Sequence, residues 1–552
     1  MKKAITIILC IVMLVSVCPT AFAAGDGTTY YVDSINGDDM NSGKSVSSAW
    51  KTLEKASSEV YSEGDKILLK AGSIFDGTFT AQGSGNAENT ITFGAYGDTE
   101  ALGKPVVRSN EDVRLVDIHN VSGWLVENIE FTAPNGKGIY ITADGSGMTT
   151  EITVRDCVFH DIYYKRCETY SGGHCPIMLS SSWATARLRN ITLKDCNIYD
   201  CAYGVNMNGL TREWSPDLFV SPEESYNTGY TLDGLNLNNI LYDGIIITSV
   251  YGMVIRNCAL INTSLNDDYY TAPMWSHHAS NYLVENCEIA GATNLKDGMA
   301  VDFDGWTTDA TYQYVYSHDN VRFIRNCCYD NYTKNANCTV RYCLSVNDNK
   351  GDNSMAQLLY IGAQDFYNED ERPVYMDNFK FYNNTLINAS EISCANLRNS
   401  YIANNIITGN LKTTFSYTRK TVDSDGNKII HEFDGVFTNN CFWGTGAPLI
   451  ARNSYFCNPG FIGKDETDKN SFMLSSKSRL IGKGIQVEED MGEHDFYGNE
   501  LTDVHNIGCY DGTGEIEKPV KNIFKCLYNR LNTLLGFIYT AILNISDRYW
   551  LF

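Results

Sequence analysis

The stretch Met253–Ile261, MVIRNCALI, returns as Tyr282–Ala290, YLVENCEIA, and this repetition decides the fold. Each copy places an aliphatic pair before a polar residue, an Asn and a small or apolar residue. Self-similarity at periods of roughly 20–50 residues is typical of a solenoid. Each copy predicts a short strand that stacks on the next rung, with the Asn at a bend where its amide bonds between rungs. Related units lie at Trp124–Thr132, Ile152–His160, Ile191–Tyr199, Val321–Tyr329, Phe379–Ile387 and Ser400–Thr408.

Segments on both sides of the repeats resemble a known family. Tyr30–Asp39 (YYVDSINGDD) and Gly64–Gly77 (GDKILLKAGSIFDG) resemble the opening segment of secreted right-handed parallel β-helix proteins, the pectate-lyase-like family. Asn458–Ile485 and Asp495–Gly512 resemble the closing segments of the same family. The resemblance covers roughly residues 28–511 and implies an all-β chain that forms one continuous right-handed parallel β-helix solenoid.

The N-terminal part is expected to close one end of this solenoid. Thr29–Val32 and Lys66–Lys70 have the composition of short strands. Between them, four apolar residues follow helical spacing and predict a helix from Ser48: Trp50, Leu53, Ala56 and Val60. A short amphipathic helix ahead of a long β-array suits a cap over an open core edge.

Both termini differ in character from the repeats. Residues 1–23 carry two lysines, an apolar run and an Ala-Phe-Ala cleavage site, which indicate a secretory signal peptide and a secreted or cell-surface protein. Residues 512–521 are a polar linker, and residues 522–552 place apolar side chains on one helical stripe. The apolar part of this tail is shorter than the roughly 20 residues of a bilayer span. We therefore expect an amphipathic C-terminal helix that lies on a membrane surface, a partner or the β-helix itself.

Composition limits the classes of partner. The chain of 552 residues has a net charge of −23 and a pI near 4.8. This acidic balance argues against nucleic acid, because phosphate binding needs basic patches. It argues less strongly against polyanionic glycans such as pectate, and neutral glycans carry no such penalty. We expect a monomer whose partner is a polysaccharide.

The cysteines do not form the pattern of a small disulfide scaffold. Of the 18 cysteines, Cys10 and Cys18 leave with the signal peptide. Five others follow an acidic or amide residue at the same place in repeated strands: Cys157, Cys196, Cys258, Cys287 and Cys327. No C-x-x-C pair occurs in the sequence, which removes the usual zinc-knuckle and thioredoxin interpretations. We expect stacked, buried free thiols in preference to metal binding, while export still permits a few disulfides.

The run DGMAVDFDG, which begins at Asp297, is where we predict the functional site. Side chains alternate between the faces of a strand, so Asp302 and Asp304 point outward beside each other with Ala300, and the intervening residues point into the core. Pairing Asp297-Gly298 with Asp243-Gly244 of an earlier rung places Asp302 in the column of His277. Neighbouring rungs lie about 4.8 Å apart, so these two side chains are expected to touch.

Four further residues are predicted to support a ligand. Trp275 shares the outward face of His277 and is available to stack on a sugar ring. His318 and Asp319 follow the next strand, where they orient a ligand or, equally, stabilise a turn. A zinc site at His277-His278 is disfavoured, because consecutive strand residues point to opposite faces.

Two nearby carboxyl groups suit glycoside hydrolysis, which needs an acid and a base or nucleophile. Their proximity also separates their pKa values, so that one carboxyl stays protonated. The same Asp-x-Asp pattern suits calcium, and an unreactive solvated face is the third interpretation. The N-T-D and G-H-G motifs of the polygalacturonase branch are absent. The pectate-lyase branch uses calcium with an Arg or Lys base, and nothing in the spacing of Arg322 or Arg325 marks either as that base.

The sequence therefore predicts an exported polysaccharide-degrading enzyme. The leading interpretation is a glycoside hydrolase whose carboxylate pair is Asp302 and Asp304, with no metal site and no required cofactor. A calcium-dependent polysaccharide lyase on the same groove is the first alternative. A non-catalytic glycan-binding surface protein is the second.

Overall fold

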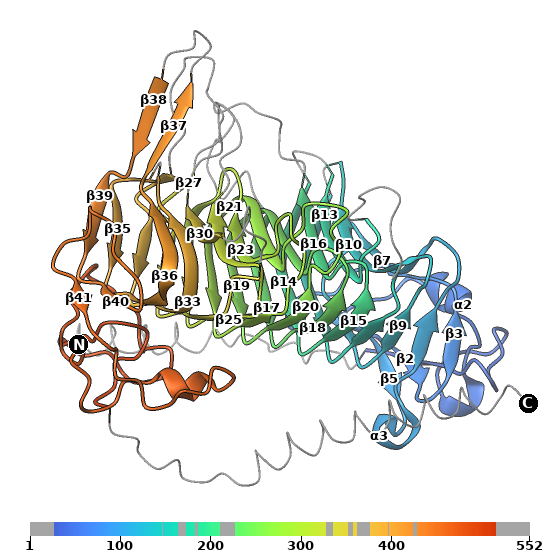
Figure 1. Cartoon of the computed structure of the whole chain (residues 1–552). Coiled ribbons are helices and arrows are strands. Elements are labelled where there is room, and N and C mark those ends of the chain that lie inside the picture. The colour runs from blue at the N-terminus through green and yellow to red at the C-terminus, as the bar shows by residue number, and fades with distance from the viewer. Residues whose placement is uncertain are drawn as a thin grey trace, which may run out of the picture.

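The structure, a computed structural model, describes residues 27–145, 147–163, 173–182, 186–209, 227–326, 335–350, 357–361, 376–395, 397–422 and 428–514. Within these ranges almost every element is a short strand, and successive turns of the chain stack into one elongated coil (Figure 1). Equivalent strands of neighbouring turns pair in parallel, so the strands form three ladders along the coil. The predicted all-β parallel β-helix is confirmed. Right-handed crossovers are the rule for parallel strands connected in this way.

The first ladder carries the outer face on which the candidate site lies. The long strands β19 and β21 bend, so that their first halves belong to this ladder and their second halves to the second ladder. In chain order the first ladder contains β4 (Phe79–Thr80), β7 (Arg114–His119), β10 (Lys137–Ala143), β13 (Ile177–Ser181), β16 (Val205–Gly209), β19 (Ile245–Arg256), β21 (Met274–Glu285), β23 (Met299–Phe303), β26 (Arg322–Asn326) and β30 (Gln357–Ile361).

The second ladder begins at the N-terminal cap. It contains β1 (Thr29–Val32), β2 (Lys66–Lys70), β5 (Ile91–Tyr96), β8 (Trp124–Glu127), β11 (Met148–Arg155), β14 (Arg187–Lys194), β17 (Asn227–Asp233), β24 (Thr308–Gln313), β28 (Thr339–Arg341), β32 (Lys380–Tyr382), β35 (Ser400–Ala403) and β39 (Gly435–Thr438). Three short strands extend it after β24: β27 (Asn335–Ala336), β31 (Met376–Asp377) and β34 (Leu397–Arg398). The predicted strands at Thr29–Val32 and Lys66–Lys70 are confirmed.

The third ladder completes each turn. It contains β3 (Ile74–Asp76), β6 (Val106–Arg108), β9 (Glu130–Thr132), β12 (Val158–His160), β15 (Asn197–Cys201), β18 (Asn236–Ile240), β20 (Ala259–Thr263), β22 (Glu288–Ala290), β25 (Tyr316–His318), β29 (Leu344–Val346), β40 (Cys441–Trp443) and β41 (Tyr455–Phe456). The long strands β33 (Thr385–Ser393) and β36 (Ile406–Ser416) continue from it into the first ladder. An antiparallel hairpin of β37 (Thr418–Val422) and β38 (Lys428–Glu432) projects from the coil near its C-terminal end (Figure 1).

Asparagine and aspartate make the bends between the second and third ladders. The residues before four of the repeat cysteines have φ between 50° and 56°: Asp156, Asp195, Asn257 and Asn286. Asn and Asp enter this left-handed region more readily than most residues, because their short polar side chains bond locally. The side chains also link rungs, as Asn257 Nδ2 donates to Asp233 Oδ1 at 2.8 Å. The predicted role of the repeat Asn is confirmed.

A row of buried asparagines has the same role near the C-terminal end. Asn384 and Asn405 donate their backbone N–H groups to the side-chain oxygens of Asn405 and Asn440, respectively, each at 2.9 Å. Asn405 Nδ2 also donates to the carbonyl oxygen of Phe381 at 2.9 Å. Each side chain therefore completes hydrogen bonds that the turning backbone leaves open.

Asn405→Ala is expected to lower the free energy of unfolding by about 2–5 kcal/mol, because it leaves a buried carbonyl and a buried N–H without partners, each costing about 1–3 kcal/mol. Urea unfolding followed by circular dichroism measures the change. The exposed Asn236, changed to Ala, is the control and is expected to change stability by less than about 0.5 kcal/mol. Equal losses in the two variants would contradict the structural role of the asparagine row.

The interior of the coil is a continuous apolar core from Val32 to Phe442. Aromatic rings stack from rung to rung within it, as Phe131 does on Phe159 with ring centroids 5.0 Å apart. The 12 cysteines of the described ranges are all buried and unpaired. The prediction of buried free thiols is confirmed for these residues, while Cys327 lies outside the described part.

The N-terminal cap contains a shorter helix than the sequence predicts. The 3-10 turn η1 covers Val46–Ser48 and the helix α2 covers only Leu53–Ser57, with the Thr52 side chain accepting the Lys55 N–H at 3.1 Å. Trp50 is buried for another reason, because it bridges to Val32 and its ring stacks on Tyr30. Val60 lies beyond the helix and is 76% exposed, so its predicted place on the buried stripe is wrong.

One predicted repeat unit lies on a different ladder from the others. Arg322–Asn326, the described part of the unit at Val321–Tyr329, forms β26 in the first ladder, whereas the other units begin in the second. In that rung β28 and β29 occupy the places of the repeat strands. Both β26 and β28 place an aliphatic residue directly before an Arg, so local pattern did not distinguish them.

The C-terminal segment packs along the last rungs of the coil. Leu474, Leu480 and Ile507 pack on Ile406 and Cys441. The segment includes the 3-10 turn η3 (Lys469–Phe472), and the short helix α3 (Thr99–Leu102) lies near the other end. Within the described ranges, no helix has the length and apolar character needed to cross a membrane. The predicted signal peptide, residues 515–521 of the predicted linker and the predicted C-terminal helix fall outside those ranges.

Candidate functional site

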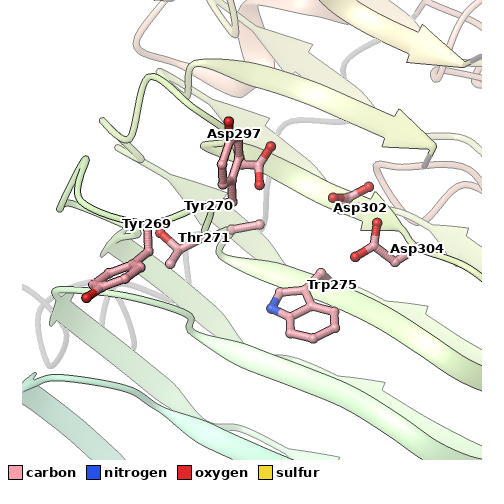
Figure 2. A pocket seen from close by; sticks show the side chains of 8 residues that line it. Tyr269, Tyr270, Thr271, Trp275, Asp297, Asp302 and Asp304 are labelled. Atoms are coloured by element: carbon pink, nitrogen blue, oxygen red, sulfur yellow. The ribbon is translucent and has the colours of Figure 1, made fainter. Parts of the chain in front are cut away.

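A pocket of about 360 Å³ opens on the outer face of the first ladder, beside β21 and β23. Figure 2 shows Tyr269 and Trp275 on one side of it and Asp302 and Asp304 on the other, with Asp297 drawn next to Tyr270. The aromatic side comes from the loop before β21 and from Trp275 on that strand. The acidic side comes from β23 and the residues that flank it. The lining residues are Tyr269, Tyr270, Thr271, Ala272, Trp275, Asp297, Asp302 and Asp304.

The alternation of β23 directs its acids to this pocket. Val301 and Phe303 belong to the core, as predicted, while Asp302 and Asp304 line the pocket. Ala300, which we expected on the outward face, is fully buried in the core. The outward direction of the two acids therefore agrees with the strand pattern, and that of Ala300 does not.

The predicted register of this rung is wrong by two residues. Thr248 and His277 are paired, as expected, but Asp302 pairs with Trp275 and not with His277. The reason lies at Gly298, where φ is +50° and the chain makes a turn that the earlier rung lacks. The chain therefore uses two more residues before β23 begins than it uses at the same place in the earlier rung. Asp304 donates its N–H to the carbonyl of Ser276 at 2.9 Å, so it is Asp304 that lies beside His277.

Asp302 is a buried acid with an unusual environment. Asp302 is only 5% exposed, and its Oδ1 atom has no hydrogen-bond partner within the described ranges. Burial raises the pKa of Asp302 well above its ordinary value, and the charge of Asp304 adds to the increase, while Arg325 opposes it. A carboxyl group in this setting holds a proton at pH values where ordinary aspartates are ionised. Such groups cluster at functional sites.

Asp297 is the third acid of the pocket, and the sequence analysis did not place it in the site. Its Oδ1 atom forms an ion pair with Arg325, and its backbone carbonyl accepts from Arg322. Burial raises the pKa of the Asp297 carboxyl although both arginines oppose the increase. The sequence held a clue to Asp297, because this residue opens the same DGMAVDFDG run. Only the turn at Gly298, however, brings Asp297 back toward Asp302 and Asp304.

Trp275 is held firmly as one wall of the pocket. Its indole Nε1 donates to Asp243 Oδ1 at 2.9 Å, and this carboxylate is buried in the preceding rung. Tyr270 contributes a ring at the rim and is 67% exposed, with the Lys296 ammonium 5.4 Å from its centroid. Aromatic faces of this kind are the surfaces on which apolar faces of ligands pack.

His277 and His278 lie at the corner beside Asp304. Their Nδ1 atoms are 2.7 Å apart, so one ring donates a proton and the other accepts it. Burial, with a contribution from His277, lowers the pKa of His278 to about 3, so this ring is neutral over the physiological range. The two side chains do not point to opposite faces, as consecutive residues of a regular strand do, because His278 has φ of 50° at the bend.

The structure does not bring His318 and Asp319 to the pocket. His318 lies on β25 in the third ladder, whereas the pocket lies on the first. His318 bonds to Glu288 at 3.1 Å and to Asp319 at 3.0 Å, and Asp319 pairs with Lys350 at 2.9 Å. The two residues are therefore part of a surface ion network on the third ladder, away from this pocket, and their contact with a substrate stays a prediction.

His318 is expected to make stability depend on pH. Burial lowers the pKa of His318, but Glu288 and Asp319 outweigh burial, so the pKa is raised above the ordinary value near 6.5. The stabilisation is fully present below that value and is lost as the pH rises through the folded-state pKa. His318→Ala should lower the free energy of unfolding by about 1 kcal/mol at pH 5.5 and by less at pH 9. Urea unfolding at both pH values checks this, and a pH-independent loss would contradict it.

Within the described part of the chain, no group of three or more His, Cys, Asp and Glu side chains is arranged to hold a metal ion. Arg325 faces Asp297, and Arg322 donates to the backbone carbonyls of Lys296 and Asp297. Both guanidinium groups are therefore engaged in building the pocket wall.

Comparison with known proteins connects the fold to carbohydrate-active enzymes. No protein-family model matches the chain. A lacto-N-biosidase of Bifidobacterium longum subsp. longum is 25% identical over an alignment that covers 89% of this chain and 37% of the relative. The chain thus spans little more than a third of the length of this relative.

Two solved structures share the fold. A GH136 lacto-N-biosidase from Eubacterium ramulus superposes with a TM-score of 0.50 at 18% identity, over 78% of this chain and 67% of that chain. The structure of XylC in complex with xylose superposes with a TM-score of 0.51 at 10% identity, over 88% of this chain and 98% of that one. At these identities the similarity establishes the parallel β-helix alone.

Proposed function

We propose that the chain is a glycoside hydrolase that acts on a neutral glycan outside the cell. The observation that carries the proposal is the group of three acids in an aromatic-walled pocket, where burial raises the pKa of Asp297 and Asp302 while Asp304 is only half-buried. Glycoside hydrolysis needs a protonated and an ionised carboxyl group on either side of the scissile bond. The sequence similarity to a lacto-N-biosidase supports the same class and makes a lacto-N-bioside the first substrate to test.

The three carboxyl groups differ in solvent exposure and direction, and these differences distinguish their roles. Oδ1 of Asp302 has almost no solvent contact, whereas Asp304 is half-buried and Asp297 directs its carboxyl group toward Asp302 (Figure 2). We assign proton donation to Asp297, because burial raises the pKa of its carboxyl group against the opposing arginines. In this state Oδ1 accepts from Arg325 as a carbonyl oxygen, and Oδ2 carries the proton. Asp304 is the ionised base or nucleophile. The predicted pair of Asp302 and Asp304 thus becomes a group of three.

Asp302 has a supporting electrostatic role in this scheme. Because burial keeps its carboxyl group protonated, it does not place a second negative charge beside Asp304. Trp275 and Tyr270 provide surfaces for the apolar faces of sugar rings. A pocket with three acids, whose arginines are engaged with its own wall, favours a neutral glycan over a uronate, since an anionic substrate would face uncompensated repulsion.

The products of the reaction test the class of enzyme. We expect the purified chain to release reducing ends from a neutral oligosaccharide or a p-nitrophenyl lacto-N-bioside, without absorbance from unsaturated uronates. Product formation should be unaffected by a chelator. Unsaturated products that a chelator abolishes would replace the hydrolase proposal with a calcium-dependent lyase. Binding without turnover would indicate a glycan-binding surface protein.

Substitution of the acids tests their roles. Asp304→Asn should lower kcat by at least about 10³-fold on every substrate, and Asp297→Asn by about 10²–10⁴-fold on natural glycans. The loss in Asp297→Asn should be much smaller on the p-nitrophenyl glycoside, because this leaving group departs without a proton. Steady-state kinetics on both substrates measures the difference.

Two further variants complete that experiment. Asp302→Asn should cost about 10-fold or less, because an amide resembles the neutral carboxyl group that burial favours. Asp309→Asn is the matched control, since Asp309 is an exposed acid in the same rung outside the pocket. If Asp302→Asn, and not Asp297→Asn, shows the dependence on the leaving group, the proton donor is Asp302 and our assignment is overturned.

A further inference from the structure

Asn294 lies outside the pocket but bonds to the loop that forms its aromatic wall. The residue is fully buried. Its side-chain Nδ2 group donates to the carbonyls of Asn266 and Tyr269 at 2.7 and 2.8 Å, and to Thr271 Oγ1 at 2.8 Å. All three acceptors belong to the loop of residues 266–272, which we call the aromatic loop. A single amide thus holds this loop over much of its length.

The oxygen of the same side chain holds the acidic side of the pocket. Asn294 Oδ1 accepts the backbone N–H of Lys296 at 2.9 Å and that of Asp297 at 3.0 Å. A third link joins the two sides, since Gly298 donates its N–H to the carbonyl of Thr271 at 3.0 Å. Asn294 therefore sets the position of Asp297 relative to Tyr269 and Thr271.

Asp243 holds the other end of the aromatic loop from the preceding rung. This acid is 1% exposed, and its Oδ1 atom accepts the Ala272 N–H at 3.0 Å together with the Trp275 indole N–H at 2.9 Å. Both donors belong to residues that line the pocket. A buried acceptor that two N–H groups of the wall share resists their displacement, because a buried donor left without a partner is costly. Asp243 therefore favours a rigid wall.

Other buried asparagines of the fold differ from Asn294 in their partners. Asn440, which is also fully buried, donates to the carbonyls of Ile402 and Thr438 and accepts from Asn405. These partners are strand and bend residues of successive rungs, far along the coil from the pocket. The partners of Asn294 are instead residues of one loop and one acid that meet at the pocket.

We propose that Asn294 and Asp243 are positioning residues that fix the aromatic loop and Trp275 against the three carboxyl groups, and so determine how tightly the pocket holds a sugar. The proposal rests on the hydrolase function given above. Catalytic constellations need their groups held within a fraction of an ångström, and supporting hydrogen bonds provide this precision. Loss of the support is expected to impair ground-state binding at the aromatic wall more than the chemical step.

The first test needs no substrate. Asn294→Asp retains an oxygen for the N–H groups of Lys296 and Asp297 but loses the donors to the aromatic loop. Asp243→Ala removes the other attachment, and Asp243→Asn restores an acceptor oxygen at that place. Hydrogen exchange of residues 266–275, read by mass spectrometry, should be at least about 10-fold faster in Asn294→Asp and Asp243→Ala, with Asp243→Asn between them and the wild type. Asn440→Asp is the matched control and should leave exchange in this loop unchanged.

The second test uses the p-nitrophenyl lacto-N-bioside. KM should rise by about 10-fold or more in Asn294→Asp and Asp243→Ala while kcat changes by less than about 3-fold, which is the signature of lost binding common to ground and transition states. Asp243→Asn should recover part of the KM. Asn440→Asp should change neither constant, whatever its effect on the unfolding midpoint.

The outcomes separate the two proposals. Wild-type exchange in the aromatic loop of both Asn294→Asp and Asp243→Ala would overturn the positioning role, as would faster exchange with an unchanged KM. If the wild-type chain turns over no glycan, the hydrolase proposal fails, and the exchange experiment still decides whether these residues hold the loop. If one variant does not fold, the other, with its exchange and KM, decides the question alone.

Discussion

Each rung of this solenoid must present its backbone N–H and C=O groups to the rungs on either side, because parallel strands in three ladders have no other partners. The chain therefore has to turn the same corners at the same places in every rung. Asn and Asp residues in the left-handed region make many of these turns, and their side chains bond to the corresponding residue of a neighbouring rung. The site depends on this regularity. Trp275, Asp302 and Arg325 come from successive rungs and meet only because the register stacks them in one column.

The same regularity explains how much of the fold could be predicted from the sequence. Strands such as Thr29–Val32 and the bends at the repeat cysteines follow from short-range pattern, because the residues that form them are adjacent in the chain. The register of β23 does not follow from short-range pattern, since it depends on how many residues form the turn at Gly298. The assignment of β26 to the first ladder could not be predicted either, because the aliphatic pattern of this strand fits any of the three ladders. The position of His318 on the third ladder was hidden for a related reason: its distance from Asp304 along the chain does not reveal that a bend lies between them.

Within the site, the outward direction of Asp302 and Asp304 was predictable from strand alternation, whereas Asp297 and the aromatic loop were not. Alternation is a property of the strand itself. Asp297 precedes β23, and Tyr269 and Tyr270 precede β21, so their positions depend on turns and on the side chains of Asn294 and Asp243. The three acids therefore rest on different kinds of support. The rigid ladder fixes Asp302 and Asp304, and a few hydrogen bonds fix Asp297 and the aromatic wall.

Two bulky residues at the corner beside the pocket adopt a positive φ, His278 at 50° and Trp306 at 65°. Most non-glycine residues with positive φ are Asn or Asp, and Tyr163, Tyr314 and Tyr342 are further bulky exceptions that do not line the pocket. Bulky side chains in this region cost of order 1–3 kcal/mol each. The two rings stack with centroids 5.8 Å apart, and His278 donates its N–H to the carbonyl of Gly305, next to Asp304. An unpartnered buried acid at Asp302 adds a second local cost in the same rung. A solenoid with many satisfied rungs tolerates these costs. Local costs of this kind are expected at functional sites, and His278, Trp306 and Asp302 bring them together beside one pocket.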